Sequence, residues 1–166
     1  MVDRKDVASW LEGPHASREP AAGSYPGARL GMPRDGAGSA GRFGRRAAAL
    51  LVDWLLCQLI AMGLFGYRWG DGGAGGFLPL AVFLAENVLL VGTVGYTVGH
   101  RVFGLRVVRV VRAGDAAPAA ASSAPLGPLG ALIRSLLLCL AIPALIWDRD
   151  ERGLHDLAAG SVIVRR

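Results

Sequence analysis

The sequence predicts an all-α integral membrane protein with two transmembrane helices, a third membrane segment that spans or re-enters, and a small cytoplasmic β element. Three observations support this class. The 166 residues are 52% hydrophobic with a mean hydropathy of +0.40, and the apolar residues are gathered into long runs. Arg45 and Arg46 stand immediately before the first run. Asp53 lies inside it, where a carboxylate costs about 3 kcal/mol to insert, so we expect it to have a functional or pairing role.

Residues 1–44 are predicted to form a flexible cytoplasmic N-terminal region, and residues 45–166 a transmembrane domain. Within residues 1–12, apolar side chains at helical spacing predict either a short amphipathic helix or a frayed terminus. From Gly13 to Gly44 the chain is rich in Gly, Pro, Ala and Ser without periodicity, which is typical of a linker. No cleavable signal peptide is recognised, so we expect the protein to stay in the membrane with its leader intact.

The first span is predicted from about Ala47 to Gly66, which is about 20 residues and therefore about the thickness of the hydrocarbon core. Every fourth residue along it is small or acidic: Ala49, Asp53, Cys57 and Ala61. Such a stripe lets another helix approach closely, so we expect Asp53 to face protein rather than lipid. Aromatic residues and a glycine loop follow, which predicts an extracytoplasmic turn.

The second span is predicted from about Phe77 to Gly99, with Glu86 near its middle and Gly95 and Gly99 forming a GxxxG contact pair. A cluster of basic residues follows it, comprising His100, Arg101, Arg106, Arg109 and Arg112. The preceding loop carries only Arg68. This asymmetry predicts a multi-pass protein of the cell membrane with a cytoplasmic N-terminus.

The remaining chain predicts a strand at Leu105–Arg112, a third apolar run at Leu129–Trp147, a short helix at Leu154–Ala159 and a last strand at Ser161–Arg165. Three complete spans would leave the tail outside the cell. A third run broken at Pro143 into a re-entrant segment would instead return the tail to the cytoplasm, where the two valine-rich strands could pair. We favour this second topology.

Depth along the helices suggests which polar groups lie at one level. At 1.5 Å per residue, Asp53 and Arg134 lie at about the same depth, and Gln58 lies near the level of Glu86. These are therefore the predicted pairs. Such groups either fix the register of the helices, line a water-filled path, or lie in the shared interior of an oligomer.

Three stretches together resemble the RDD family of membrane proteins: GRRAAALLVDWLL at 44–56, GYTVGHRVFGLRVVRV at 95–110 and RGLHDLAAGSVIV at 152–164. The family is named for one arginine and two aspartates, which match Arg46, Asp53 and Asp156 here. The resemblance implies a role in the transport of ions or other ligands. It also requires the tail to return to the cytoplasmic face if these three residues are to act together.

Two functions follow as hypotheses. In the first, Asp53, with Glu86, binds an ion or small ligand during transport, while Arg46 or Arg134 competes for the carboxylate; Asp156 completes the candidate residues. In the second, the protein is a membrane-anchored interaction or assembly subunit that docks a partner through residues 1–12.

Other classes of function are not expected. One His155–Asp156 dipeptide without a second histidine cluster does not indicate an enzyme, and we expect neither a cofactor nor a metal. The formal net charge of +5 comes from arginines beside apolar runs, which favours anionic lipids as partners and argues against nucleic acid. Beyond the lipid bilayer, we expect a homo-oligomer or a membrane protein partner.

Overall fold

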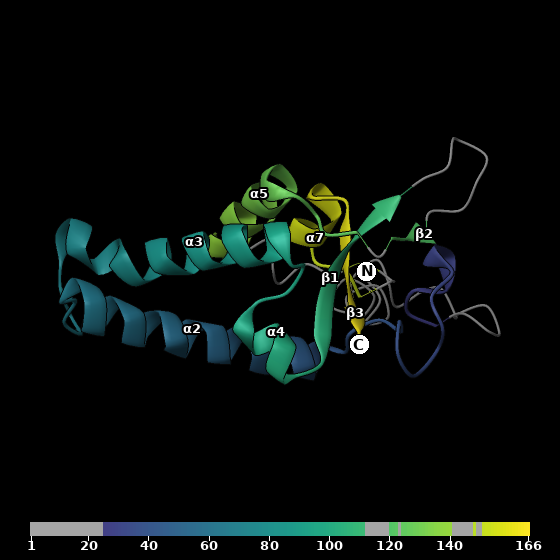
Figure 1. Ribbon diagram of the computed structural model, residues 1–166, viewed down its shortest axis with the longest axis horizontal. Helices are drawn as coiled ribbons and strands as arrows, with labels where there is room; N and C mark the ends of the chain where they lie inside the picture. The colour runs from purple at the N-terminus through teal and green to yellow at the C-terminus, as the bar shows by residue number, and fades with distance from the viewer. Residues whose placement is uncertain (1–24, 112–119, 123, 141–147, 149–150) are drawn as a thin grey trace, which may run out of the picture.

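The computed structural model of the protein describes residues 25–111, 120–122, 124–140, 148 and 151–166. Two long antiparallel helices form a hairpin, and a small sheet with three shorter helices lies at one end of it (Figure 1). The helix predicted within residues 1–12 lies outside the described residues.

The hairpin consists of α2 (Phe43–Phe65) and, on the return, η2 (Gly73–Phe77) leading into α3 (Leu78–Thr93). α2 ends where Gly66 adopts a left-handed conformation with φ 70° and its N–H bonds the carbonyl of Ala61. Both arms are long and apolar enough to cross a membrane, at 23 residues for α2 and 21 for Gly73–Thr93. Two membrane-capable helices therefore occur where the sequence predicts them.

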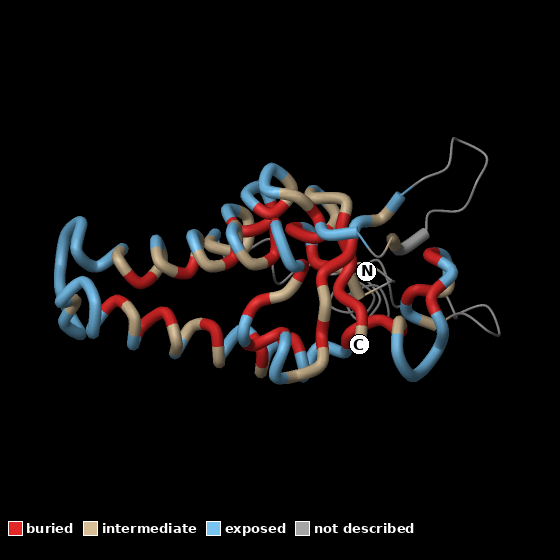
Figure 2. The backbone as a smooth tube through the Cα atoms, in the orientation of Figure 1, coloured by how far each residue is buried: buried red, intermediate tan, exposed pale blue. Residues whose placement is uncertain are grey.

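The facing sides of the hairpin are buried and the outer sides are exposed (Figure 2). On α2 the predicted stripe is the buried side, since Ala49, Cys57 and Ala61 are fully buried and Asp53 is 2% exposed. The opposite side carries exposed leucines: Leu51, Leu55 and Leu59. An outer surface of this kind is typical of a helix that faces lipid.

The sequence predicts that the second apolar run continues as one helix to Gly99, but the structure breaks it earlier. α3 ends at Thr93, the chain turns at Gly95 with φ 82°, and a new helix, α4, runs over Val98–Val102. Thr97 caps α4, because its side chain accepts from the N–H of His100 while the His100 side chain accepts from the N–H of Thr97. Of the predicted GxxxG pair, Gly95 therefore makes a turn and Gly99 makes the close helix contact.

The sheet has the order β2-β1-β3. β1 (Leu105–Val111) pairs antiparallel with β3 (Ser161–Arg165), with Leu105 opposite Arg165, and β2 (Ala120–Ala121) pairs with the far end of β1. The predicted pairing of the two valine-rich segments is confirmed. It brings the end of the chain to the end of the hairpin where α2 begins (Figure 1).

The segment that precedes α2 differs from the expected linker, because residues from Tyr25 onward lie against the sheet. It contains η1 (Ala28–Leu30), and its backbone continues the hydrogen bonding along β3, with Gly41 N–H bonding the carbonyl of Ile163 at 2.9 Å. Leu30 and Met32 are each 4% exposed and belong to an apolar cluster with three valines of β1 and β3. Few apolar residues are enough to hold this segment in place, because its backbone also pairs with the edge of β3.

Two shorter helices complete the fold. α5 (Pro128–Cys139) packs along α3 and against α7 (Leu154–Ala158), which precedes β3. The contact with α3 is close, since a Cβ added at Gly92 would lie 3.1 Å from the Cα of Pro128. The 12 residues of α5 extend only about 18 Å, which is less than the hydrocarbon core. The rest of the predicted third membrane segment, residues 141–147, lies outside the described residues.

Candidate functional site

Asp156 lies on α7 and is fully buried between two arginines from other parts of the chain. Its Oδ1 accepts from Arg134 Nε at 2.8 Å, and its Oδ2 lies 3.3 Å from Arg46 Nη1. Ser161 Oγ lies 3.3 Å from Oδ1. Burial by itself would raise the pKa of the Asp156 carboxyl group, but Arg134, His155 and Arg46 hold it down at about 2. The carboxylate is therefore ionised at neutral pH.

Arg46 joins α2 to the sheet as well as to α7. In addition to its contact with Asp156, its Nε donates to the carbonyl of Gly41 at 2.7 Å and its Nη2 donates to that of Ile163 at 3.4 Å. The guanidinium is thus held by acceptors before α2, on α7 and on β3. A planar group with five donors suits such a junction better than a lysine ammonium.

Asp53 has different partners from the one predicted, because both of them belong to the start of α4. Thr97 Oγ1 donates to Oδ2 at 2.5 Å, and the backbone N–H of Gly99 donates to Oδ1 at 2.6 Å. The helices are in direct contact at this point, since a Cβ added at Gly99 would lie 2.1 Å from the carbonyl oxygen of Ala49. Asp53 therefore anchors α4 to α2, and both of its oxygens are bonded.

The two pairs predicted from depth are wrong in their partners. Arg134 pairs with Asp156 rather than with Asp53, although Arg134 and Asp53 line the same cavity, as their equal depth suggests. Glu86 accepts from Cys57 Sγ at 3.0 Å rather than from Gln58, whose Oε1 has no hydrogen-bond partner among the described residues. Depth fixes the level of a side chain but not the direction in which it points around its helix.

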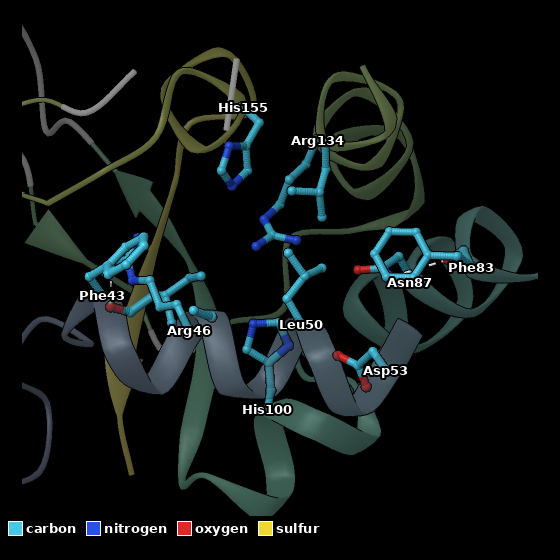
Figure 3. A pocket seen from close by; sticks show the side chains of 12 residues that line it. Phe43, Arg46, Leu50, Asp53, Phe83, Asn87, His100, Arg134 and His155 are labelled. Carbon is cyan, nitrogen blue, oxygen red and sulfur yellow. Dashed lines mark hydrogen bonds between the residues drawn. The ribbon is translucent and has the colours of Figure 1, made fainter. Parts of the chain in front are cut away.

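A cavity of about 210 Å³ lies between α2, α3, α5 and α7. Figure 3 shows Arg134 and His155 pointing toward α2, with His100 approaching from α4. The lining residues fall into a polar group and an apolar group: Arg46, Asp53, Asn87, His100, Arg134 and His155, then Phe43, Ala47, Leu50, Phe83, Leu138 and Ile163. Arg134 is 2% exposed, and its Nη1 has no hydrogen-bond partner among the described residues. A buried donor of this kind indicates a site for an acceptor.

His100 is one cavity residue whose importance the sequence does not reveal. Its burial, together with nearby Arg134, lowers its pKa to about 3, so the imidazole is neutral at pH 7. Its Nδ1 lies 2.5 Å from Thr97 Oγ1, so the ring lies directly beside the hydroxyl that bonds Asp53. The spacing of Thr97 and His100 has the form of a capping box with His in the third position, and this is the signal that could have identified the pair.

No three His, Cys, Asp or Glu side chains gather into a metal site within the part of the chain that the structure describes. His155 Nε2 lies 3.6 Å from Asp156 Oδ2, but this carboxylate is already bonded by two arginines. The site therefore consists of buried ion pairs beside a cavity large enough for a ligand.

A sequence model described as the RDD family matches residues 40–160, which include Arg46, Asp53 and Asp156. No curated protein and no solved structure matches the chain.

Proposed function

The chain belongs to the RDD family, and from this premise we propose that it is a membrane protein involved in the transport of an ion or small ligand. The single observation that carries this proposal is the cavity in which charged residues from α2 and α5 converge, beside the fully buried Asp156 of α7. Ionisable side chains at membrane depth usually mark a substrate or ion path. A cavity with apolar walls and a few convergent polar groups is the usual form of a ligand site.

The distribution of arginines supports an orientation with the sheet in the cytoplasm. The end of the hairpin that carries the sheet also carries the basic residues around it: Arg42, Arg45, Arg101, Arg106, Arg109, Arg165 and Arg166. The loop at the other end carries only Arg68. By the positive-inside rule the cavity then lies in the half of the cell membrane nearer the cytoplasm.

The contacts suggest how a ligand would couple to the protein. Arg46 and Arg134 share Asp156 rather than competing for Asp53, whose oxygens are bonded by Thr97 and Gly99. A ligand that accepts from Arg134 would share this guanidinium with Asp156 and so act on the contact of α5 with α7. Such a differential interaction is what a ligand needs in order to shift a protein between two arrangements.

Flux through reconstituted vesicles tests the proposal. Purified full-length protein in vesicles loaded with a pH-sensitive dye would receive pulses of sodium, potassium or phosphate salts across a pH gradient. We expect a salt-dependent flux that Asp53→Asn removes, because the amide keeps only one acceptor oxygen for the two donors, Thr97 and Gly99, and α4 is then displaced. Asp71→Asn is the matched control, since Asp71 is an exposed carboxylate in the far loop. Full flux in Asp53→Asn would exclude this carboxylate from the mechanism.

The second candidate function is an interaction or assembly subunit. The observation that favours it is the structural character of the buried polar contacts, since the bonds of Asp53 and Asp156 each tie one helix to another. Absence of flux for every salt, together with capture of a partner that depends on residues 1–12, would select this alternative. A homo-oligomer stays a prediction, although one chain alone already buries Asp53, Arg134 and Asp156.

A further inference from the structure

We propose that the cavity binds the oxyanion head of a membrane amphiphile, a phosphate or carboxylate that Arg134 holds while the apolar tail leaves the cavity over α2. This inference deepens the proposed function, since it names the chemical class of the ligand, and it rests on that function in treating the cavity as the ligand site.

The first argument concerns the hydrogen-bonding groups of the cavity that have no partner in the described part of the chain. Both oxygens of Asp53 and both oxygens of Asp156 already have donors, so these carboxylates have little left to offer a cation. Arg134 instead lines the cavity, and its buried Nη1 has no hydrogen-bond partner among the described residues. A group that accepts hydrogen bonds fits this site, and guanidinium groups bind phosphate and carboxylate oxygens especially well.

The second argument is the balance of charge. Two arginines and two carboxylates sum to zero: Arg46, Arg134, Asp53 and Asp156. A free anion in water would therefore gain little from long-range attraction and would lose its hydration on entry. Binding must gain additional free energy from contact with the apolar walls, and this favours an anion attached to an apolar tail.

The third argument is where the cavity opens. Phe43, Ala47 and Leu50 line it from successive turns of α2 and are themselves exposed, Phe43 by 60% and Leu50 by 41%. In the proposed orientation these first two turns lie at the boundary between headgroups and acyl chains. An amphiphile could enter sideways from this leaflet, with its head near Arg134 and its tail along Leu50.

The cavity is also large enough for such a head. A volume of about 210 Å³ is many times the roughly 10–15 Å³ that one water molecule requires. It is too small for a whole lipid, so the tail must remain outside, against the exposed apolar residues at the opening.

The test is a titration of the full-length protein in detergent micelles with three probes: dioleoyl phosphatidic acid, dioleoylglycerol and inorganic phosphate. Binding is followed by the rise in Tm and by the apparent Kd. We expect phosphatidic acid to bind, and dioleoylglycerol, which lacks the phosphate, and inorganic phosphate, which lacks the tail, to bind at least about tenfold more weakly. Equal binding of dioleoylglycerol would overturn the role of the oxyanion, and equal binding of inorganic phosphate would overturn the membrane source.

Two variants locate the site. Leu50→Trp places a larger side chain at the opening and should weaken phosphatidic acid binding about tenfold, whereas Leu51→Trp, on the outer side of the same helix, should leave it unchanged. Arg134→Lys keeps a positive charge for Asp156 but removes Nη1, and should also weaken binding. Equal affinity in both tryptophan variants would overturn the assignment of the cavity.

The outcome separates this inference from the proposed transport. Salt-dependent flux by a protein that does not bind phosphatidic acid would overturn the inference and leave the transport proposal in place. Binding of phosphatidic acid by a protein without flux would support the inference and count against transport.

Discussion

Gly99 is the position where one added carbon should do most harm to the site. The substitution Gly99→Ala would place a Cβ 2.1 Å from the carbonyl oxygen of Ala49 and 2.9 Å from Asp53 Cγ. To relieve the overlap, α4 and α2 would have to separate by about 1 Å. The hydrogen bond from Gly99 N–H to Asp53 Oδ1, now 2.6 Å, would then exceed bonding distance.

The cost follows from these two effects. Overpacking of a tight contact costs about 1–3 kcal/mol. Loss of a hydrogen bond to a charged group adds about 1.5–3 kcal/mol, because the carboxylate stays buried. We therefore expect Gly99→Ala to lower the free energy of unfolding by about 2.5–6 kcal/mol, a large part of the total for a domain of this size.

Equilibrium unfolding in mixed micelles, followed by tryptophan fluorescence, measures this difference. Gly63→Ala is the matched control, because Gly63 lies within α2 and a Cβ there would meet nothing within 4 Å. It should leave stability unchanged or raise it by up to about 1 kcal/mol, owing to the higher helix propensity of alanine. Equal stability of the two variants would refute the close contact between α2 and α4.

Three further outcomes are expected. In a double-mutant cycle for unfolding, Arg134→Gln and Asp156→Asn should couple by about 1–3 kcal/mol. The cycle of Arg134→Gln with Asp53→Asn should give less than about 0.5 kcal/mol. A larger coupling of Arg134 with Asp53 than with Asp156 would instead support the pairing predicted from depth. Because the pKa of His100 is about 3 in the folded protein, below its ordinary 6.5, the unfolded chain binds the extra proton and stability falls as pH drops below 6.5, by up to about 1.4 kcal/mol per unit. His100→Gln should flatten the pH profile of Tm in this range, and an unchanged profile would mean that this ring is not buried as a neutral group. Met32→Ala should lower the free energy of unfolding, measured by chemical denaturation, by about 2–3 kcal/mol. A decrease of less than about 0.5 kcal/mol would mean that the segment before α2 does not pack on the sheet.

Elements with a strong local signal could be predicted from the sequence. The long apolar run of α2 and the β-branched strands β1 and β3 appear at the predicted positions, because length and composition decide them. The buried stripe on α2 is also local information, since a period of four along a helix selects one face. The resemblance implies only that the tail must return if Arg46, Asp53 and Asp156 act together, and the structure adds that Arg46 meets Asp156.

Features that depend on distant parts of the chain could not be predicted in the same way. The segment before α2 is ordered because β3 offers it an edge, and β3 lies more than 100 residues away. The break after Thr93 depends on a cap formed by Thr97 and on the contact of Gly99 with α2. The partner of Arg134 depends on where α7 places Asp156. The sequence shows that Asp156 belongs to the C-terminal tail but does not indicate its depth relative to Arg134.

The three signature residues can now be assigned to joints between elements. Arg46 and Asp156 hold the start of α2 against α7 and β3, and Asp53 holds α4 against α2. Loss of Asp156 leaves two buried arginines without their shared carboxylate, which is more damaging than replacement of the whole set by apolar groups. The same geometry brings Arg134 to the cavity with its Nη1 unbonded within the described residues. A ligand that accepts this N–H would therefore act on the joint itself, because the guanidinium that binds it also holds α5 to α7.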